Sequence, residues 1–78
     1  MFTVYVLKDN KGKFYKGLTS DLKRRLREHH LGHTVTTSKM ANLKVVYTEE
    51  YLTFEEARLR EKYFKTAAGR RFLKGKIM

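Results

Sequence analysis

The sequence predicts a small α+β fold, in which helices flank a three-stranded antiparallel sheet in the order β-β-α-β-α-α. Residues 2–8, 13–18 and 43–51 are rich in the β-branched and aromatic residues that favour strands. Residues 2–8 carry apolar groups on both faces, which is typical of a central, covered strand. With 78 residues the chain has room for one domain, which we expect to span residues 1–78.

The first two strands are joined by a short polar turn, residues 9–12, in which Gly12 suits a left-handed position. A three-residue loop there places Tyr5 and Tyr15 on the same face of the sheet, whereas a two-residue turn separates them. Two tyrosines on one face are most often there for packing, so the pair alone does not indicate a site.

The first helix is expected to start after Thr19 or Ser20, which are both good N-terminal caps. It should run to about residue 31, because Gly32 then offers a helix end. A polar loop, residues 33–42, leads from this helix to the third strand.

The basic residues of this helix are not equivalent. At 100° per residue, Leu22 and Leu26 mark the buried stripe, and Arg25 and His29 lie at its edge, facing the sheet. Arg24 points away toward solvent.

The last third of the chain predicts two more helices. Thr53 should open the first, with Glu56 three residues later completing a capping box, and the helix should run to about Thr66. Gly69 is expected to break the chain before one short final helix.

Glu61 lies in the middle of an apolar face of the second helix. That face carries Phe54, Ala57, Phe64 and Ala68. A carboxylate among apolar groups must be paired, protonated or bound to a cation. Lys65 offers an ordinary helix ion pair at i+4, and a metal ion is the functional alternative.

The charge of the chain predicts a polyanionic partner. Eighteen Lys and Arg against eight Asp and Glu give a net charge of +10, and no acidic residue follows Glu61. Such a chain is drawn to phosphates by charge neutralisation and counterion release. Solubility or an anionic membrane surface would also use this charge, but its density favours nucleic acid. The residues expected to contact phosphates are Lys16, Arg24, Lys39, Arg70 and Arg71.

The composition also excludes some classes of protein. Cysteine is absent, so disulfides and thiolate metal sites are ruled out. No apolar run approaches the ~20 residues that span a bilayer. We therefore expect a cytoplasmic protein with no membrane segment, either a monomer or a weak dimer.

Together, these side chains have the composition of a site that cuts phosphodiesters. A carboxylate can hold a divalent cation, which activates water and stabilises developing charge. An arginine can clamp the phosphate, and a phenol or imidazole can move the proton of the attacking water.

In this order, the motifs resemble those of the GIY-YIG nuclease family, especially its small stand-alone members. Residues 3–5 (Thr-Val-Tyr) stand where the GIY element would be, and residues 15–17 (Tyr-Lys-Gly) stand at the YIG element. Residues 18–29 are similar to the first-helix signature of the family, and residues 56–65 are similar to the second-helix signature.

The resemblance implies an endonuclease that uses one Mg²⁺ or Mn²⁺ and acts on DNA rather than RNA. It assigns the metal to Glu61 and the scissile phosphate to Arg25. It assigns the general base, or the group that orients water, to Tyr5 first and Tyr15 second, with support from His29. Since an unperturbed tyrosine has a pKa near 10, the metal or Arg25 would have to lower the pKa of that tyrosine.

Two other functions share this charge and fold: a nucleic-acid-binding module without turnover, and a basic adaptor for an acidic or ribonucleoprotein partner. Leu18 stands where many family members carry a lysine, and the tail, residues 69–78, lacks the asparagine found there in many members. Glu61 favours the nuclease, because a carboxylate opposes phosphate binding unless a cation intervenes. The nuclease hypothesis is supported if Arg25 and Glu61 share a pocket over the tyrosines, and weakened if Glu61 turns outward to Lys65.

Overall fold

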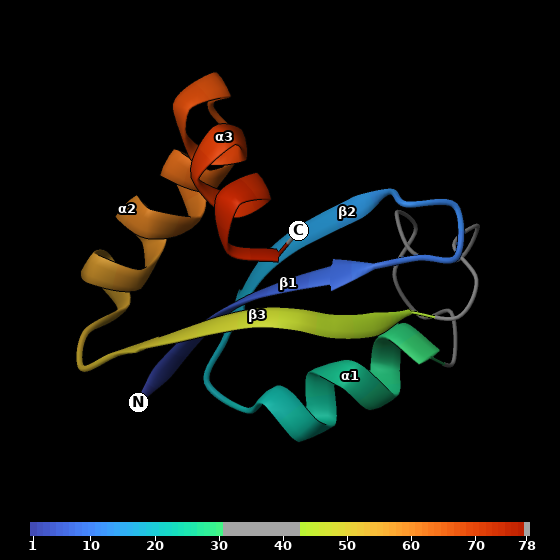
Figure 1. The fold of residues 1–78 in the computed structure, drawn as a ribbon. Coiled ribbons are helices and arrows are strands. Elements are labelled where there is room, and N and C mark those ends of the chain that lie inside the picture. The colour runs from blue at the N-terminus through green and yellow to red at the C-terminus, as the bar shows by residue number, and fades with distance from the viewer. Residues whose placement is uncertain (31–42, 78) are drawn as a thin grey trace.

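The computed structural model of the chain describes residues 1–30 and 43–77. The elements are β1 (Phe2–Lys8), β2 (Phe14–Thr19), α1 (Leu22–His30), β3 (Lys44–Tyr51), α2 (Phe54–Phe64) and α3 (Ala67–Ile77) (Figure 1). This order confirms the predicted α+β fold. The predicted loop, residues 33–42, lies outside the described residues, as do Gly32 and Lys39.

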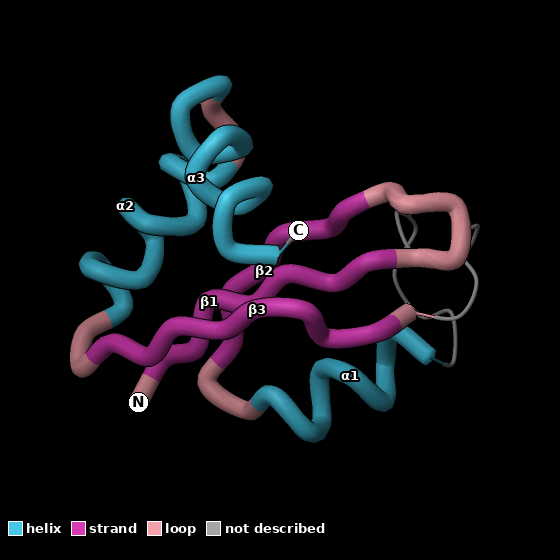
Figure 2. Tube along the Cα trace, in the orientation of Figure 1, coloured by secondary structure: helices cyan, strands magenta, loops and turns pink. Residues whose placement is uncertain are grey.

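The three strands form one antiparallel sheet in the order β2-β1-β3, so that β1 is the central strand, as predicted (Figure 2). Strand β2 is an edge strand. Four consecutive residues of β1, from Val4 to Leu7, have no exposed surface. Successive side chains of a strand point to opposite faces, so β1 must be covered on both sides.

The helices supply that cover, with α1 on one side of the sheet and α2 and α3 on the other (Figure 1). Each face of β1 therefore belongs to a different hydrophobic cluster. Val4 and Val6 pack with residues of α2 and α3, namely Ala57, Phe64 and Leu73. Tyr5 and Leu7 pack instead with Leu43 and with the partly buried Tyr15, Leu22 and Leu26.

The hairpin between β1 and β2 has a three-residue loop, which is the alternative that places Tyr5 and Tyr15 on one face. The Gly12 amide donates to the Asp9 carbonyl at 3.2 Å, and the Asp9 amide donates to the Lys13 carbonyl at 2.9 Å. Gly12 has φ of +84°, in the left-handed region that favours glycine. The buried Asp9 carboxylate accepts from the amides of Lys11 and Lys13, at 2.9 and 2.7 Å, and so stabilises the turn.

Asp21 caps helix α1, so the prediction of Thr19 or Ser20 was wrong by one or two positions. The Asp21 carboxylate accepts from the Arg24 amide at 3.1 Å, and its carbonyl accepts from the Arg25 amide at 3.0 Å. Thr19 acts one step earlier, because its hydroxyl accepts from the Asp21 amide at 3.0 Å. Three cap-forming residues stand in a row here, and the choice among them depends on where β2 ends.

Helix α2 begins as predicted at the Thr53 cap, whose hydroxyl accepts from the Glu56 amide at 3.2 Å. Gly69, however, does not break the chain, because α3 already starts at Ala67 and continues through it. Thr66 caps α3 by accepting from the Gly69 amide at 3.1 Å. A Cβ on Gly69 would overlap the backbone of Tyr63, so this glycine allows α3 to approach the end of α2.

Within the described residues, every helix is too short or too polar to span a bilayer.

Gly69→Ala should destabilise the protein by about 2 kcal/mol, because the added methyl group must push α3 away from backbone atoms. Gly75→Ala is the matched control in the same helix, since a Cβ there meets nothing within 4 Å. It should stabilise the protein by about 0.5–1 kcal/mol through helix propensity. Urea unfolding of both variants measures the difference, and equal effects would contradict this role of Gly69.

Candidate active site

Tyr5 lies in the middle of β1 with no exposed surface, on the face that α1 covers. Its partner across the β1–β2 ladder is Gly17. A Cβ on Gly17 would overlap the end of the Tyr5 ring, including the hydroxyl. The glycine therefore lets the phenol lie flat over β2 and extend toward α1.

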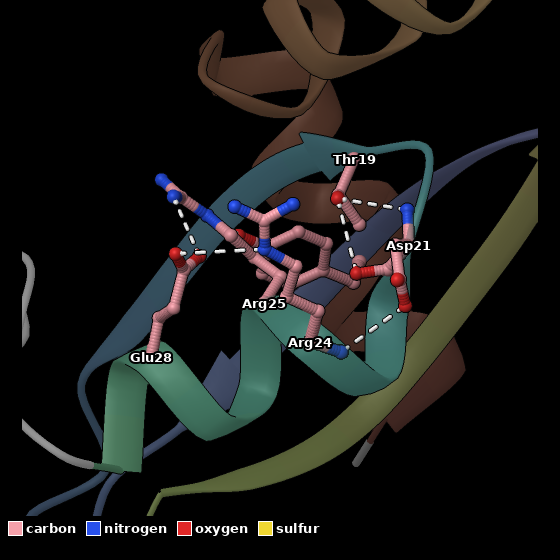
Figure 3. A network of polar contacts seen from close by, with 6 residues as sticks. Thr19, Asp21, Arg24, Arg25 and Glu28 are labelled. Carbon is pink, nitrogen blue, oxygen red and sulfur yellow. Dashed lines mark hydrogen bonds and ion pairs between the residues drawn. The ribbon is translucent and has the colours of Figure 1, made fainter.

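The hydroxyl of Tyr5 meets the guanidinium of Arg25. The Arg25 Nε donates to the Tyr5 oxygen at 3.4 Å, and Nη1 forms an ion pair with Glu28 at 3.3 Å. Figure 3 shows the Arg25 and Glu28 side chains turned toward each other along α1. About a third of the Arg25 side chain is exposed, so an anion can reach it.

Tyr15 completes this group, because it pairs with Leu7 and so lies on the same face as Tyr5. The two tyrosine rings have centroids 6.2 Å apart. Hydrogen bonds raise the pKa of Arg25, the largest contribution coming from Tyr5 and smaller ones from Tyr15 and Glu28. The structure thus brings Tyr5, Tyr15 and Arg25 together as the sequence predicted. His29 is in α1, but its side chain is outside the described part of the structure.

The ionisation of Tyr5 differs from what a general base requires. Burial raises its pKa to about 12, and the opposing effect of Arg25 is smaller. Tyr5 therefore stays protonated near neutral pH. We expected Arg25 or a metal to bring this pKa below its usual value, but the lowering effect of Arg25 is too small to offset burial.

An open groove of about 260 Å³ lies beside Arg25, at the turn from β2 into α1. Arg24 lies on its outer side, with its side chain mostly exposed and 4.0 Å from Glu28. The groove is lined by Leu18, Thr19, Ser20, Asp21, Arg24, Arg25 and Glu28. Two arginines at an open groove form a surface that can take a phosphate group.

Glu61 is buried in α2, with 8% of its surface exposed. Its carboxylate forms ion pairs with Arg58 at 2.7 Å and Lys65 at 3.8 Å. The predicted pair with Lys65 is therefore present, although Glu61 is not turned outward. Helix α2 packs on the face of the sheet opposite Tyr5 and Arg25. Glu61 therefore lies on the side of the sheet opposite the tyrosines, and among the described residues the predicted pocket shared by Arg25 and Glu61 over the tyrosines is not observed.

The chemistry of Glu61 fits Mg²⁺, which usually keeps several waters and binds through one or two carboxylates together with substrate phosphates. A metal site enclosed by the protein would need several such ligands close together. Among the residues that the structure describes, no group of three or more His, Cys, Asp or Glu is placed to hold a metal. In the structure, Arg58 and Lys65 neutralise the charge of Glu61.

Lys16 and Arg70, two of the predicted phosphate contacts, belong to elements on that second side, and the charge of Arg70 acts on Lys16. Lys16 pairs with Val6 and so points toward α2 and α3. Burial lowers the pKa of Lys16, and the charges of Arg70 and Lys65 lower it further. Arg71 is exposed, one residue further along α3.

Sequence reasoning missed the polar network that anchors α2 to β3. Arg60 binds the Glu49 carboxylate through two nitrogens, at 2.9 and 3.2 Å, and the hydroxyls of Tyr47 and Tyr51 each donate to Glu49 at 2.5 Å. The alternation of Tyr47, Glu49 and Tyr51 could have predicted it, because residues two apart in a strand lie on the same face. The Arg60 guanidinium also stacks 4.6 Å from the Phe72 ring centroid. The network fixes the residue directly before Glu61.

Comparison with known proteins agrees with this architecture. The model of the GIY-YIG catalytic domain matches residues 1–74. The chain therefore belongs to the GIY-YIG family of nuclease domains, which confirms the resemblance drawn from its motifs.

Within that family the chain is similar to small proteins named UPF0213. It is 35% identical over 72 residues to one from Staphylococcus epidermidis, covering 91% of this chain and 88% of the relative. It is 36% identical over 63 residues to one from Streptococcus agalactiae, covering 80% and 72%. The solution structure of a UPF0213 protein from Bacillus halodurans matches with a TM-score of 0.60 and 28% identity, covering 96% of this chain and 84% of that one.

Gly17→Ala should destabilise the protein by about 1–3 kcal/mol, because the new methyl group overlaps the Tyr5 ring. In a Tyr5→Leu background the same substitution should cost much less, since the far end of the ring is gone. A double-mutant cycle by chemical denaturation measures this coupling. Additive costs would show that Gly17 is required for some other reason.

Glu49→Gln should destabilise the protein by about 2 kcal/mol at pH 7, because it weakens hydrogen bonds between charged groups. Hydrogen bonds from Arg60, Tyr47 and Tyr51 outweigh burial and lower the pKa of Glu49. Its contribution to stability is therefore complete above the ordinary glutamate pKa of about 4.3, and it is lost as the pH falls through the lowered value.

Thermal unfolding between pH 7 and pH 2 tests this dependence. The difference in stability between the wild type and Glu49→Gln should shrink on acidification. Glu50→Gln removes an exposed carboxylate on the same strand and is the control. A difference that stays constant down to pH 2 would be inconsistent with the lowered pKa.

Proposed function

We propose that this protein is a metal-dependent endonuclease that hydrolyses phosphodiester bonds in DNA. The observation that carries the proposal is the convergence of Tyr5 and Tyr15 on Arg25, which lines an open groove. Membership of the GIY-YIG family of nuclease domains supports the same chemistry.

Arg25 is the residue that would hold the scissile phosphate. Its raised pKa keeps it fully charged, and its contacts with Tyr5 and Glu28 fix the direction of the guanidinium plane. A preorganised cation of this kind stabilises the extra negative charge that develops on the phosphate during hydrolysis. Glu28 moderates the positive charge until a phosphate arrives.

The two tyrosines would have different tasks. Tyr5 is fully buried and its pKa is raised to about 12, so it is suited to positioning Arg25 and not to accepting a proton. Tyr15 is only partly buried and lies beside it, so it is the better candidate to contact the attacking water. The sequence had predicted the opposite order, with Tyr5 as the first choice for the general base and Tyr15 as the second. His29 remains a proposed supporting residue for that water.

Glu61 is the residue that would hold Mg²⁺ or Mn²⁺. A bound cation would add positive charge beside a substrate phosphate and lower the pKa of its coordinated water. To bind there, it must compete with Arg58, the nearer of the two cations beside Glu61. Because Glu61 and Arg25 belong to opposite faces, the substrate strand would pass around the free edge of β2 to reach both.

The second candidate is a nucleic-acid-binding module without turnover. The ion pairs that already neutralise Glu61 favour it, because they give this carboxylate a structural role without any metal. The two functions share the basic surface and differ only in whether the bond is cut.

The test is cleavage of supercoiled plasmid, flaps, junctions, single strands and RNA with Mg²⁺ or Mn²⁺. The wild type should nick DNA, and both Arg25→Ala and Glu61→Gln should reduce the rate by at least about 10²-fold. The first variant loses the cation that holds the phosphate, and the second loses the ligand of the metal ion. Arg27→Ala and Glu55→Gln are exposed substitutions on the same two helices and should leave the rate unchanged.

Circular dichroism should show that all four variants remain folded. A wild type that cuts no substrate with either metal would reject the enzyme and leave the binding module. Full activity in Glu61→Gln would place the metal elsewhere.

A further inference from the structure

We propose that Lys16, Lys65 and Arg70 form a site for one backbone phosphate of a nucleic acid, next to Glu61 and separate from the phosphate at Arg25. The proposal rests on the proposed function only in taking nucleic acid as the ligand. It adds a defined second contact, which sets the path of the substrate strand across the molecule.

The three cations come from three different elements. Lys16 lies in β2 opposite Val6, on the face of the sheet that α2 and α3 cover. Lys65 is the C-terminal cap of α2. Arg70 is in the first turn of α3, where its amide donates to the carbonyl of Thr66. The fold therefore brings together charges that are far apart in the sequence.

This cluster carries repulsion that no carboxylate fully relieves. Lys16 is partly buried, and besides burial the charges of Arg70 and Lys65 lower its pKa. In the described part of the chain, neither Lys16 nor Arg70 forms an ion pair with a carboxylate, and Lys65 shares Glu61 with Arg58. Neighbouring like charges that carboxylates compensate only in part favour the binding of an anion.

The position of the cluster favours a phosphate within a chain over a free anion. Lys65 contacts Glu61, so a phosphate held by Lys65 lies beside the carboxylate proposed for the metal. Lys16 is also only two residues from Leu18, which lines the groove of Arg25. A nucleic-acid backbone that crosses the edge of β2 would therefore meet Arg25 on one side and the three cations on the other.

The first test is binding of a labelled DNA oligonucleotide by fluorescence anisotropy in EDTA, where metal-dependent cleavage is absent. Lys16→Met, Lys65→Gln and Arg70→Gln should each weaken binding by about tenfold, which is the expected cost of losing a charge-assisted contact. The slope of log K against log salt should become shallower by about 1 when the site is lost.

Matched controls separate this site from general charge. Lys13→Met and Lys62→Gln remove exposed lysines from the hairpin and from α2, and should change the affinity less than twofold. Arg71→Gln removes the same charge as Arg70→Gln, but from a position 100° further around α3, and should have a smaller effect. Equal losses in all six variants would overturn the proposal in favour of diffuse attraction.

The second test uses stability, which separates a binding role from a structural one. Because partial burial and the charges of Arg70 and Lys65 disfavour the charged form of Lys16, Lys16→Met should raise the melting temperature by about 2–4 °C while it weakens DNA binding. A lower melting temperature together with unchanged affinity would show that Lys16 only supports the fold.

Two further results distinguish the possible ligands and the two proposals. Inorganic phosphate at millimolar concentration should not displace the oligonucleotide; displacement at that concentration would show a free-anion site instead. If the variants of Lys16, Lys65 and Arg70 bind DNA normally while the wild type nicks plasmid, only the second phosphate site is overturned. If these three residues are needed for binding but the wild type cuts nothing, the phosphate site is upheld and the nuclease is rejected.

Discussion

The complete burial of β1 on both faces is the constraint on which the arrangement of both candidate surfaces depends. Alternate side chains of one strand must serve two separate cores, so Tyr5 and Val6 belong to opposite sides of the sheet. The phenol–guanidinium group is thereby separated from Glu61 and the basic cluster. In the proposed mechanism the two groups approach each other at the outer edge of β2, so an edge strand would take part in function.

The scarce acidic residues are used mainly to hold the fold together. Asp9 stabilises the hairpin, Asp21 caps α1, and Glu49 ties β3 to α2. Glu28 and Glu61 each pair with two basic residues. Most of the remaining positive charge is therefore uncompensated and exposed, so the same composition provides a stable fold and an attraction for polyanions.

Local rules predicted much of this structure, and tertiary contacts decided the rest. The hairpin loop is local, so the sequence narrowed the placement of Tyr5 and Tyr15 to two alternatives, and the three-residue loop of the structure puts them on one face. The role of Gly69 depends on the backbone of another helix, which no local pattern contains. The helical period correctly predicted that Glu61 is buried, but it does not say which face of the sheet receives α2. The pKa of Tyr5 likewise depends on a balance between burial and Arg25 that only coordinates reveal.

The three-residue hairpin loop has a consequence for how this protein can vary. Inserting or deleting one residue there would rotate β2 by one side-chain position relative to β1, and every residue of the strand would change faces. Lys16 would then enter the buried layer of phenols, and Tyr15 would move to the basic side. Changes of two residues in the length of this loop should therefore be tolerated better than changes of one residue.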